Sequence, residues 1–278
     1  MSKLKTLLHR ATGHAMGPIQ RLIDPGALGE KLKPFIFLDF FNAVIEPGFG
    51  FGMHPHSGIA TLTWQPDTDV AYEDTTGQKG VLKAGGLEWM NSGGGAWHQG
   101  HLMGSGPAKG LQLWVAMPPG IEDGPATGHY VPPEAVPRLP IAGGHVQVLL
   151  GEFSEAGVRA ASPIPSHQAM NYGVLTLETG ASWNYHPPED HDVAWAFVFD
   201  GQARVQGQDG KGQLLVLDGP GDIQVQALGP GARVLIGTAV RHPHPLVMGP
   251  SSVHTNAASL QAGHRRIRDI AQALGFKR

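Results

Sequence analysis

The stretch that decides the fold reads Gly-Phe-Gly-Phe-Gly-Met-His-Pro-His-Ser-Gly, at residues 48–58 of a chain of 278 residues. Its first glycine is followed after five residues by His54, and His56 comes two positions later. The same spacing returns once, because Gly180 is followed after five residues by His186. A pattern repeated within one chain indicates two similar structural units. We therefore expect a tandem architecture.

Short apolar runs bounded by turn residues account for most of the remaining sequence. The 40 glycines and 23 prolines exclude a long helical bundle, because both residues interrupt helices. A hydrophobic content of 41% is enough for packed cores and excludes a disordered chain. The runs predict an all-β fold with strands near residues 34–41, 59–64, 111–116, 145–151, 172–178, 193–199, 213–217, 223–227 and 232–240.

Two further segments complete the expected organisation. Residues 257–274 carry apolar side chains at helical spacing, which predicts a short C-terminal helix. Residues 117–140 are rich in proline, as is typical of a semi-rigid connector. We therefore expect an N-terminal domain at residues 1–125 and a C-terminal domain at residues 126–278.

The histidines of the first half have the spacing of a metal site. His54 and His56 are two residues apart, so on a strand their side chains point to the same face. His98 follows the glycines at residues 93–95, which allow a sharp turn that would bring a third imidazole back to the pair. Histidine nitrogen binds iron, nickel, copper and zinc. In the second half Pro188 stands where His56 stands in the first, so we expect that half to be metal-free.

The spacing of His54, His56 and His98 resembles a cupin metal site. Longer stretches resemble the pirin family within the cupin superfamily; these are residues 34–41, 54–58, 86–93, 111–115 and 243–256. The resemblance implies two cupin-type β-barrels in tandem (a bicupin) and a metal ion in the N-terminal barrel alone. Iron is the usual ion in this family, so Fe(II) is the expected cofactor, with nickel, copper, manganese and zinc as alternatives.

The sequence departs from the pirin pattern at two positions. Pirins carry a glutamate four residues after the second histidine and another, a metal ligand, two residues after the third; here these positions are Ala60 and Gly100. His101 is one residue beyond the missing ligand. Strand alternation would turn it away from the metal, whereas a bulge at Gly100 would turn it back. His101 is therefore a candidate fourth ligand and a candidate base, and the alternative is a histidine outside the site.

The resemblance implies a metal-dependent dioxygenase like quercetin 2,3-dioxygenase, with a small aromatic or flavonol-like substrate. Because both carboxylates are missing, that activity should be weakened. Whether the protein catalyses a reaction at all is left open by the sequence. One alternative is a non-catalytic regulatory protein that acts through contact with a protein partner, as the family also implies. A further alternative is a relic that binds no metal.

Charge and composition exclude several other classes of protein. A net charge of −3 gives no positively charged surface for nucleic acid, so we expect no direct binding to DNA or RNA. The chain has no cysteine, which excludes disulfides and thiolate metal sites. No stretch approaches the ~18 apolar residues of a transmembrane helix. We therefore expect a cytoplasmic protein without a membrane partner.

Overall fold

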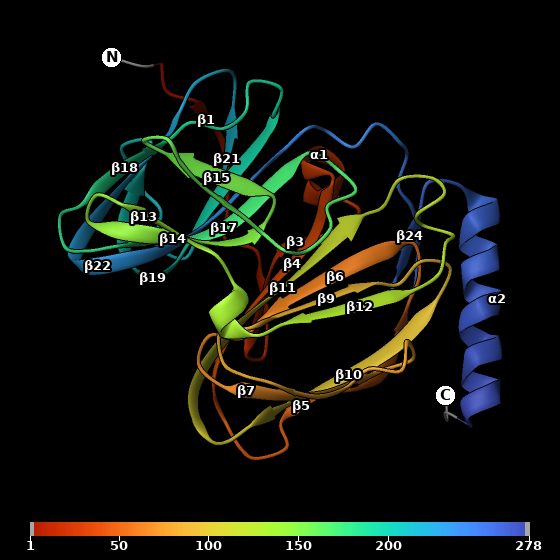
Figure 1. Ribbon diagram of the computed structural model, residues 1–278. Coiled ribbons are helices and arrows are strands. Elements are labelled where there is room, and N and C mark those ends of the chain that lie inside the picture. The colour runs from red at the N-terminus through yellow and green to blue at the C-terminus, as the bar shows by residue number, and fades with distance from the viewer. Residues whose placement is uncertain (1–2, 276–278) are drawn as a thin grey trace. The chain divides into compact units, whose positions relative to one another are not determined.

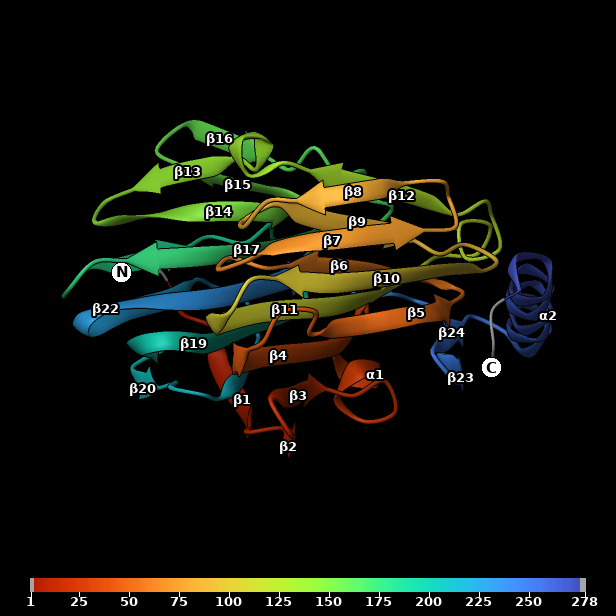
Figure 2. The ribbon, with the colours of Figure 1, turned by 90° about the horizontal axis from the view of Figure 1, so that it is seen from below.

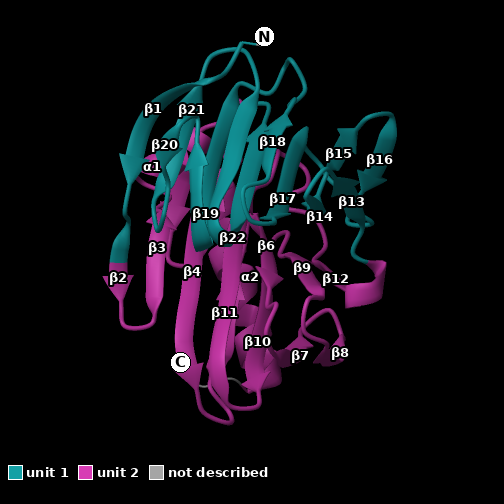
Figure 3. Ribbon diagram, turned by 90° about the vertical axis from the view of Figure 1, so that its left-hand side faces the viewer, with its two compact units in different colours: residues 1–14, 136–241 teal, residues 15–135, 242–278 magenta. Residues whose placement is uncertain are grey.

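The computed structural model describes residues 3–275 and consists mainly of β-strands (Figure 1). Two compact units are present, coloured separately in Figure 3. Unit 1 combines Met1–His14 with Val136–Arg241, and unit 2 combines Ala15–Ala135 with His242–Arg278. The predicted all-β fold of two cupin-type barrels with a C-terminal helix is confirmed.

The two units differ from the expected ranges 1–125 and 126–278. The proline-rich stretch contains a strand, β12 (Thr127–Val131), which pairs with β9 (Leu87–Asn91) and so belongs to unit 2. β12 lies at the edge of its sheet, where neighbouring prolines remove no ladder hydrogen bond. The two ends of the chain also depart from sequence order. The N-terminal segment Met1–His14 belongs to unit 1, which is otherwise formed by the second half of the chain, and the C-terminal segment His242–Arg278 belongs to unit 2, which is otherwise formed by the first half.

Unit 2 contains a seven-stranded and a four-stranded sheet. The larger sheet has the order β12-β9-β6-β11-β4-β3-β2, and the smaller has the order β5-β10-β7-β8, whose members lie side by side in Figure 2. Their bounds are β2 (His14–Met16), β3 (Ile19–Ile23), β4 (Phe35–Ile45), β5 (Gly50–His56), β6 (Ile59–Trp64), β7 (Asp69–Asp74), β8 (Lys79–Leu82), β10 (Ala96–Met103) and β11 (Gly106–Ala116). A short helix, α1 (Leu28–Leu32), precedes β4.

Burial and close backbone contact shape the barrel of unit 2. β6 is buried at five of its six positions, which explains why its sequence is apolar without alternating. β5 and β10 approach so closely that a Cβ atom at Gly50 would collide with the carbonyl oxygen of Gly100. Glycine is therefore required at position 50, and the approach brings the side chains of β5 close to those of β10.

Unit 1 is built on a nine-stranded sheet. Its main path is β1-β21-β19-β22-β17-β14-β13, with β18 on β22 and β20 on β19, and β15 and β16 form a separate hairpin. The bounds are β1 (Thr6–Ala11), β13 (Arg138–Ile141), β14 (Gly144–Leu150), β15 (Glu152–Glu155), β16 (Val158–Ala161), β17 (Met170–Leu177), β18 (Ser182–Tyr185), β19 (Val193–Val205), β20 (Gln208–Asp209), β21 (Leu214–Asp218) and β22 (Ile223–Ala239). Apolar side chains from most of these strands form one buried cluster.

Helix α2 (Ala257–Leu274) follows the hairpin of β23 (Val247–Gly249) and β24 (Ser252–His254) and belongs to unit 2. The side chain of Asn256 caps its N-terminus by accepting a hydrogen bond from the Ser259 amide, and Gly275 ends it with φ 68°. Its apolar face packs on Trp97, whose indole nitrogen donates to the carbonyl of Ile267 over 3.0 Å. Within residues 3–275, no helix is both long enough and apolar enough to cross a membrane.

Candidate metal centre

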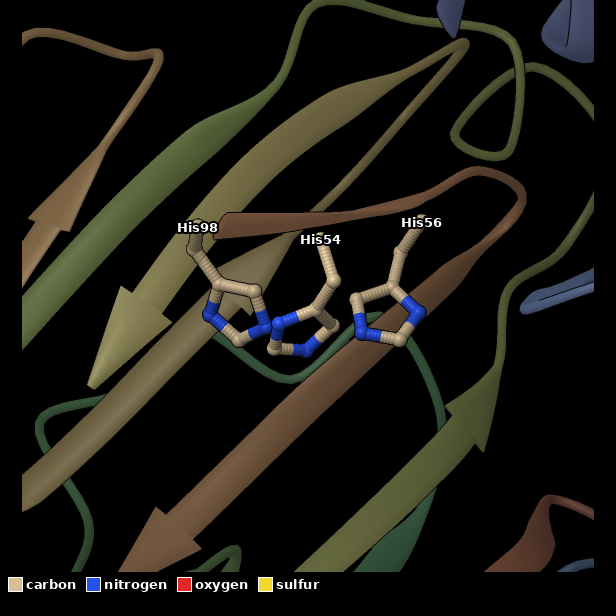
Figure 4. A group of neighbouring side chains, drawn as sticks. All are labelled: His54, His56 and His98. Atoms are coloured by element: carbon tan, nitrogen blue, oxygen red, sulfur yellow. The ribbon is translucent and has the colours of Figure 1, made fainter. Parts of the chain in front are cut away.

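Three histidines of unit 2 lie together on two neighbouring strands. His54 and His56 are two residues apart on β5, so their side chains share one face of that strand. β10 pairs antiparallel with β5 and places His98 directly opposite His54. Figure 4 shows the three imidazoles turned toward one another. The structure thus brings together the three histidines that the sequence spacing singled out.

The spacing of the three rings suits one shared cation. One nitrogen from each ring lies within 4.8 Å of the other two. The ring centroids are 4.5 Å apart for His54 and His98, 5.0 Å for His54 and His56, and 5.2 Å for His56 and His98. An ion that is about 2.1 Å from each nitrogen keeps its ligand atoms roughly 3–3.5 Å apart. The three rings are therefore close enough together to be candidates for sharing one ion.

Hydrogen bonds on the outer side of each ring determine which nitrogen faces the centre. The Nδ1 atom of His54 lies 2.7 Å from the carbonyl oxygen of Gly52, and that of His56 lies 2.9 Å from the carbonyl oxygen of Ser251. A carbonyl only accepts, so both rings carry their proton on Nδ1 and keep a lone pair on Nε2. Among the described residues, neither His56 Nε2 nor His98 Nε2 has a hydrogen-bond partner, although both are buried. Buried nitrogens that converge with free lone pairs fit a metal ion.

Burial keeps the imidazoles of His54 and His56 neutral. Desolvation, together with the neighbouring His98, lowers the pKa of His54 from 6.5 to about 4. The same two effects lower the pKa of His56 well below 6.5. Neutral imidazole is the form that binds a metal. Both side chains are therefore ready to bind an ion at neutral pH.

A carboxylate that the sequence analysis did not assign lies beside this group. Glu88 on β9 places Oε1 2.8 Å from His98 Nδ1, and the two side chains are 6% and 4% exposed. A carboxylate on the outer nitrogen of a histidine ligand fixes the ring and makes the inner nitrogen more basic. The one available signal in the sequence was an acidic residue inside the otherwise uncharged run Leu87–Asn91.

A small cavity borders the histidines. It measures about 70 Å³ and has apolar walls from Phe41, Phe51, Val70, Leu102 and Leu111, together with Glu88, His54 and His98. Asp39 also lines it, but both of its carboxylate oxygens accept hydrogen bonds of 2.9 Å from the guanidinium of Arg21. Glu88 is thus the cavity carboxylate that is not neutralised by an arginine.

Gly100 and Ala60, where the pirin pattern has glutamates, occupy different places. Gly100 lines the cavity, and a Cβ atom built on it would meet Val70 Cγ1 at 3.4 Å, an ordinary contact. Ala60 lies on β6, fully buried, and is not among the described residues that line the cavity. The missing side chain at position 100 therefore leaves space next to the histidines.

The prediction that His101 reaches the metal needs a correction. The bulge between β5 and β10 adds its extra residue to β5, because His98 pairs with His54 and Gly100 pairs with Phe51. β10 itself keeps an unbroken register against β7, so its alternation continues through residue 100. His98, Gly100 and Leu102 line the cavity, whereas His101 is absent from its described lining. His101 faces the other side of β10 and joins neither the ligands nor the candidate bases.

Comparison with known sequences gives a consistent result. The Pirin family model matches residues 18–115, a range that includes all three histidines. A Pseudomonas aeruginosa protein, provisionally named a quercetin 2,3-dioxygenase, is 29% identical over 97% of this chain and 98% of its own length. A pirin-like protein of Solanum lycopersicum is 28% identical over 93% of this chain and 89% of its own length.

Solved structures show the same fold. A quercetin 2,3-dioxygenase from Acinetobacter baumannii matches with a TM-score of 0.86 at 22% identity, covering 97% of this chain and 98% of that one. The bacterial pirin YhhW from Escherichia coli, in complex with nickel(II), matches with a TM-score of 0.63 at 19% identity, covering 87% of this chain and 100% of that one. At 22% and 19% sequence identity, these two matches show a shared fold only.

Proposed function

We propose that this chain, which matches the Pirin family model over residues 18–115, is a metal-dependent dioxygenase of the pirin type that acts on a planar aromatic, flavonol-like substrate, as quercetin 2,3-dioxygenases do. The observation that supports this most strongly is the convergence of three imidazoles on one point. The outer nitrogens of His54 and His56 are occupied by carbonyl oxygens, which leaves their inner nitrogens for a metal.

His54, His56 and His98 would hold the ion. We propose Fe(II), with nickel, copper, manganese and zinc as alternatives, since imidazole suits iron, nickel, copper and zinc. A divalent ion bound there would supply Lewis acidity and open positions for an enolic oxygen and for dioxygen. The nickel complex of the E. coli pirin is consistent with a divalent ion in this family.

The residues of the chain have separate tasks in this proposal. Glu88 orients His98 through the 2.8 Å hydrogen bond and is the carboxylate placed to accept the proton of a bound enol. Phe41 and Leu111 would pack on the aromatic rings of the substrate. With Gly100 in place of a glutamate, no carboxylate from β10 would join the ligands, so the turnover of flavonols should be slower than in a pirin that has the glutamate.

The size of the cavity favours a second candidate function. At about 70 Å³ it is smaller than the ~150 Å³ that holds benzene and far below the ~300–1,000 Å³ of typical ligand sites. A flavonol would enter only if side chains at the rim, such as the 47% exposed Phe51, moved aside. A metal-binding protein that regulates a partner through protein contact needs no such opening.

Oxygen consumption separates the two candidates. Purified protein loaded with Fe(II) or Ni(II) is mixed with quercetin in an oxygen electrode, and bound metal is measured by elemental analysis. The proposal predicts oxygen uptake by the wild type, and loss of that uptake together with one equivalent of metal in His54→Ala. His101→Ala is the matched control, because His101 lies nearby on β10 but outside the cavity, and it should retain both.

Two outcomes count against the dioxygenase. Full metal content without oxygen uptake, for quercetin and for smaller enols alike, favours the regulatory candidate. If His54→Ala keeps the same metal content as the wild type, the three imidazoles are not a binding site.

A further inference from the structure

A second group of ligand-type side chains lies in unit 2, at the start of α2. It consists of Glu122 and Asp123, which precede β12, and His254, the last residue of β24. One ligand atom from each residue lies within 4.8 Å of the other two. Glu122 is fully buried and His254 is 1% exposed, whereas the side chain of Asp123 is 45% exposed. The group therefore joins two buried donors to one that solvent reaches.

Hydrogen bonds behind His254 fix its tautomer. Ser57 Oγ donates to Ser252 Oγ over 2.9 Å, so the proton of the Ser57 hydroxyl is already used. The same oxygen lies 3.0 Å from His254 Nε2 and has to accept from it. The ring proton is therefore on Nε2, and Nδ1 presents a lone pair. Within the described part of the chain, this buried Nδ1 atom has no hydrogen-bond partner.

The lone pair of His254 faces two carboxylate oxygens. Nδ1 lies 3.5 Å from Asp123 Oδ1 and 3.7 Å from Glu122 Oε2. Both distances exceed the ~2.7–3.2 Å of an N–H···O hydrogen bond. Three electron-pair donors that converge in a buried site repel one another unless a cation lies between them. An ion about 2.1 Å from each atom spans these two distances with N–metal–O angles of roughly 113° and 124°, between tetrahedral and trigonal geometry.

The two carboxylates are held in place from behind. The backbone amide and the hydroxyl of Thr255 each donate to Glu122 over 2.6 Å. Ser259, in the first turn of α2, donates its hydroxyl to Asp123 Oδ2 over 2.7 Å, which leaves Oδ1 directed toward His254. The donors are therefore arranged before any ion arrives, as in a preorganised metal site.

We propose that Glu122, Asp123 and His254 bind a divalent transition-metal ion of the zinc type, which fastens the start of α2 to the segment ahead of β12. One imidazole and two carboxylates are ligands that zinc takes. Asp123 borders a groove of about 1180 Å³ along α2, so the ion can enter from solvent and keep a water molecule as its fourth ligand. This site shares no ligand with the three-histidine centre and does not depend on the function of that centre.

Zinc titration of the full chain tests the proposal. The background is His54→Ala, which disables the first centre without touching His56, the neighbour of Ser57. Calorimetry of chelator-stripped protein should show one equivalent of zinc, and Asp123→Asn should weaken it at least ~100-fold, since even outer contacts to metal ligands cost ~10–100-fold. Asp269→Asn is the matched control, because Asp269 is an exposed acid that borders the same groove. It should bind zinc as the background does.

Hydrogen exchange supplies the second measurement. Zinc should slow amide exchange in α2 of the background variant and of Asp269→Asn, but not of Asp123→Asn. The proposal is overturned if zinc binds equally well with and without the Asp123 carboxylate. It is also overturned if zinc does not bind to the background variant. If NMR then finds His254 protonated on both nitrogens, the group is a buried ion pair.

Discussion

Replacing Glu88 with glutamine should weaken metal binding about 10- to 100-fold, the usual cost of losing a carboxylate behind a histidine ligand. Glutamine has the same size, but it turns a charge-assisted hydrogen bond to His98 into a neutral one, a loss of about 1–1.5 kcal/mol or roughly tenfold in affinity. The amide can also present its NH₂ group to Nδ1, which would move the ring proton to Nε2 and remove the inner lone pair. The 2.8 Å contact is nearly excluded from water, so solvent cannot replace it.

Calorimetric titration of chelator-stripped protein with Ni(II) measures this effect. The matched control is Glu73→Gln on β7, because Glu73 pairs with Lys79 at the surface and lies outside the cavity lining among the described residues. Thermal melting of both variants without metal checks that the fold is kept. If Glu88→Gln binds nickel as tightly as the wild type, the carboxylate does not govern the orientation of His98, and its role in the centre is wrong.

Three further predictions concern other parts of the molecule. Gly100→Glu should tighten metal binding and raise oxygen uptake with quercetin, because the cavity has room beside Val70; a lower melting temperature with no gain in affinity would contradict this. For the metal-stripped protein, the free energy of unfolding should fall as the pH drops from about 6.5 to about 4, since His54 binds a proton near 6.5 when unfolded but at about 4 when folded. Urea titrations at several pH values should show that the free energy of unfolding depends less steeply on pH in His54→Ala than in the wild type. An equal pH dependence in the two proteins would refute the assignment of this effect to His54. In unit 1, His186 is hydrogen-bonded to Asp222 and should hold no metal, which an anomalous-scattering peak there without added metal would disprove.

Local patterns predicted the elements of the fold well where one periodicity ran without interruption. The helix expected at residues 257–274 is α2, and the strand expected at 59–64 is β6. Prediction was less accurate where a turn signal lies inside a strand. The runs at residues 223–227 and 232–240 fall mostly within one strand, β22, whose register against β19 shifts between Gly201 and Gln202. A bulge uses the same glycines and prolines as a turn, so the two look alike in sequence.

The residues of the candidate site also fall into those that local spacing predicts and those that depend on how the strands pair. His54 and His56 could be predicted because the i, i+2 relation is local, and His98 followed from one glycine-rich turn. The position of His101 depends on which of two paired strands carries the extra residue, and spacing along one strand does not contain that information. Glu88 reaches His98 from β9, ten residues earlier in the chain. Contacts of this kind are determined by the closure of the barrel rather than by any motif.

The carbonyl of Ser251 that holds His56 has a consequence for biosynthesis. These residues are 195 positions apart, so the ribosome makes the acceptor long after it has made the histidine. During that interval Trp97 also lacks the face of α2 on which it packs. A nascent chain that ends near residue 125 would therefore expose an apolar patch and a freely rotating imidazole. Metal loading should accordingly be a late event that follows release of the chain, and a fragment of the first half alone should load poorly.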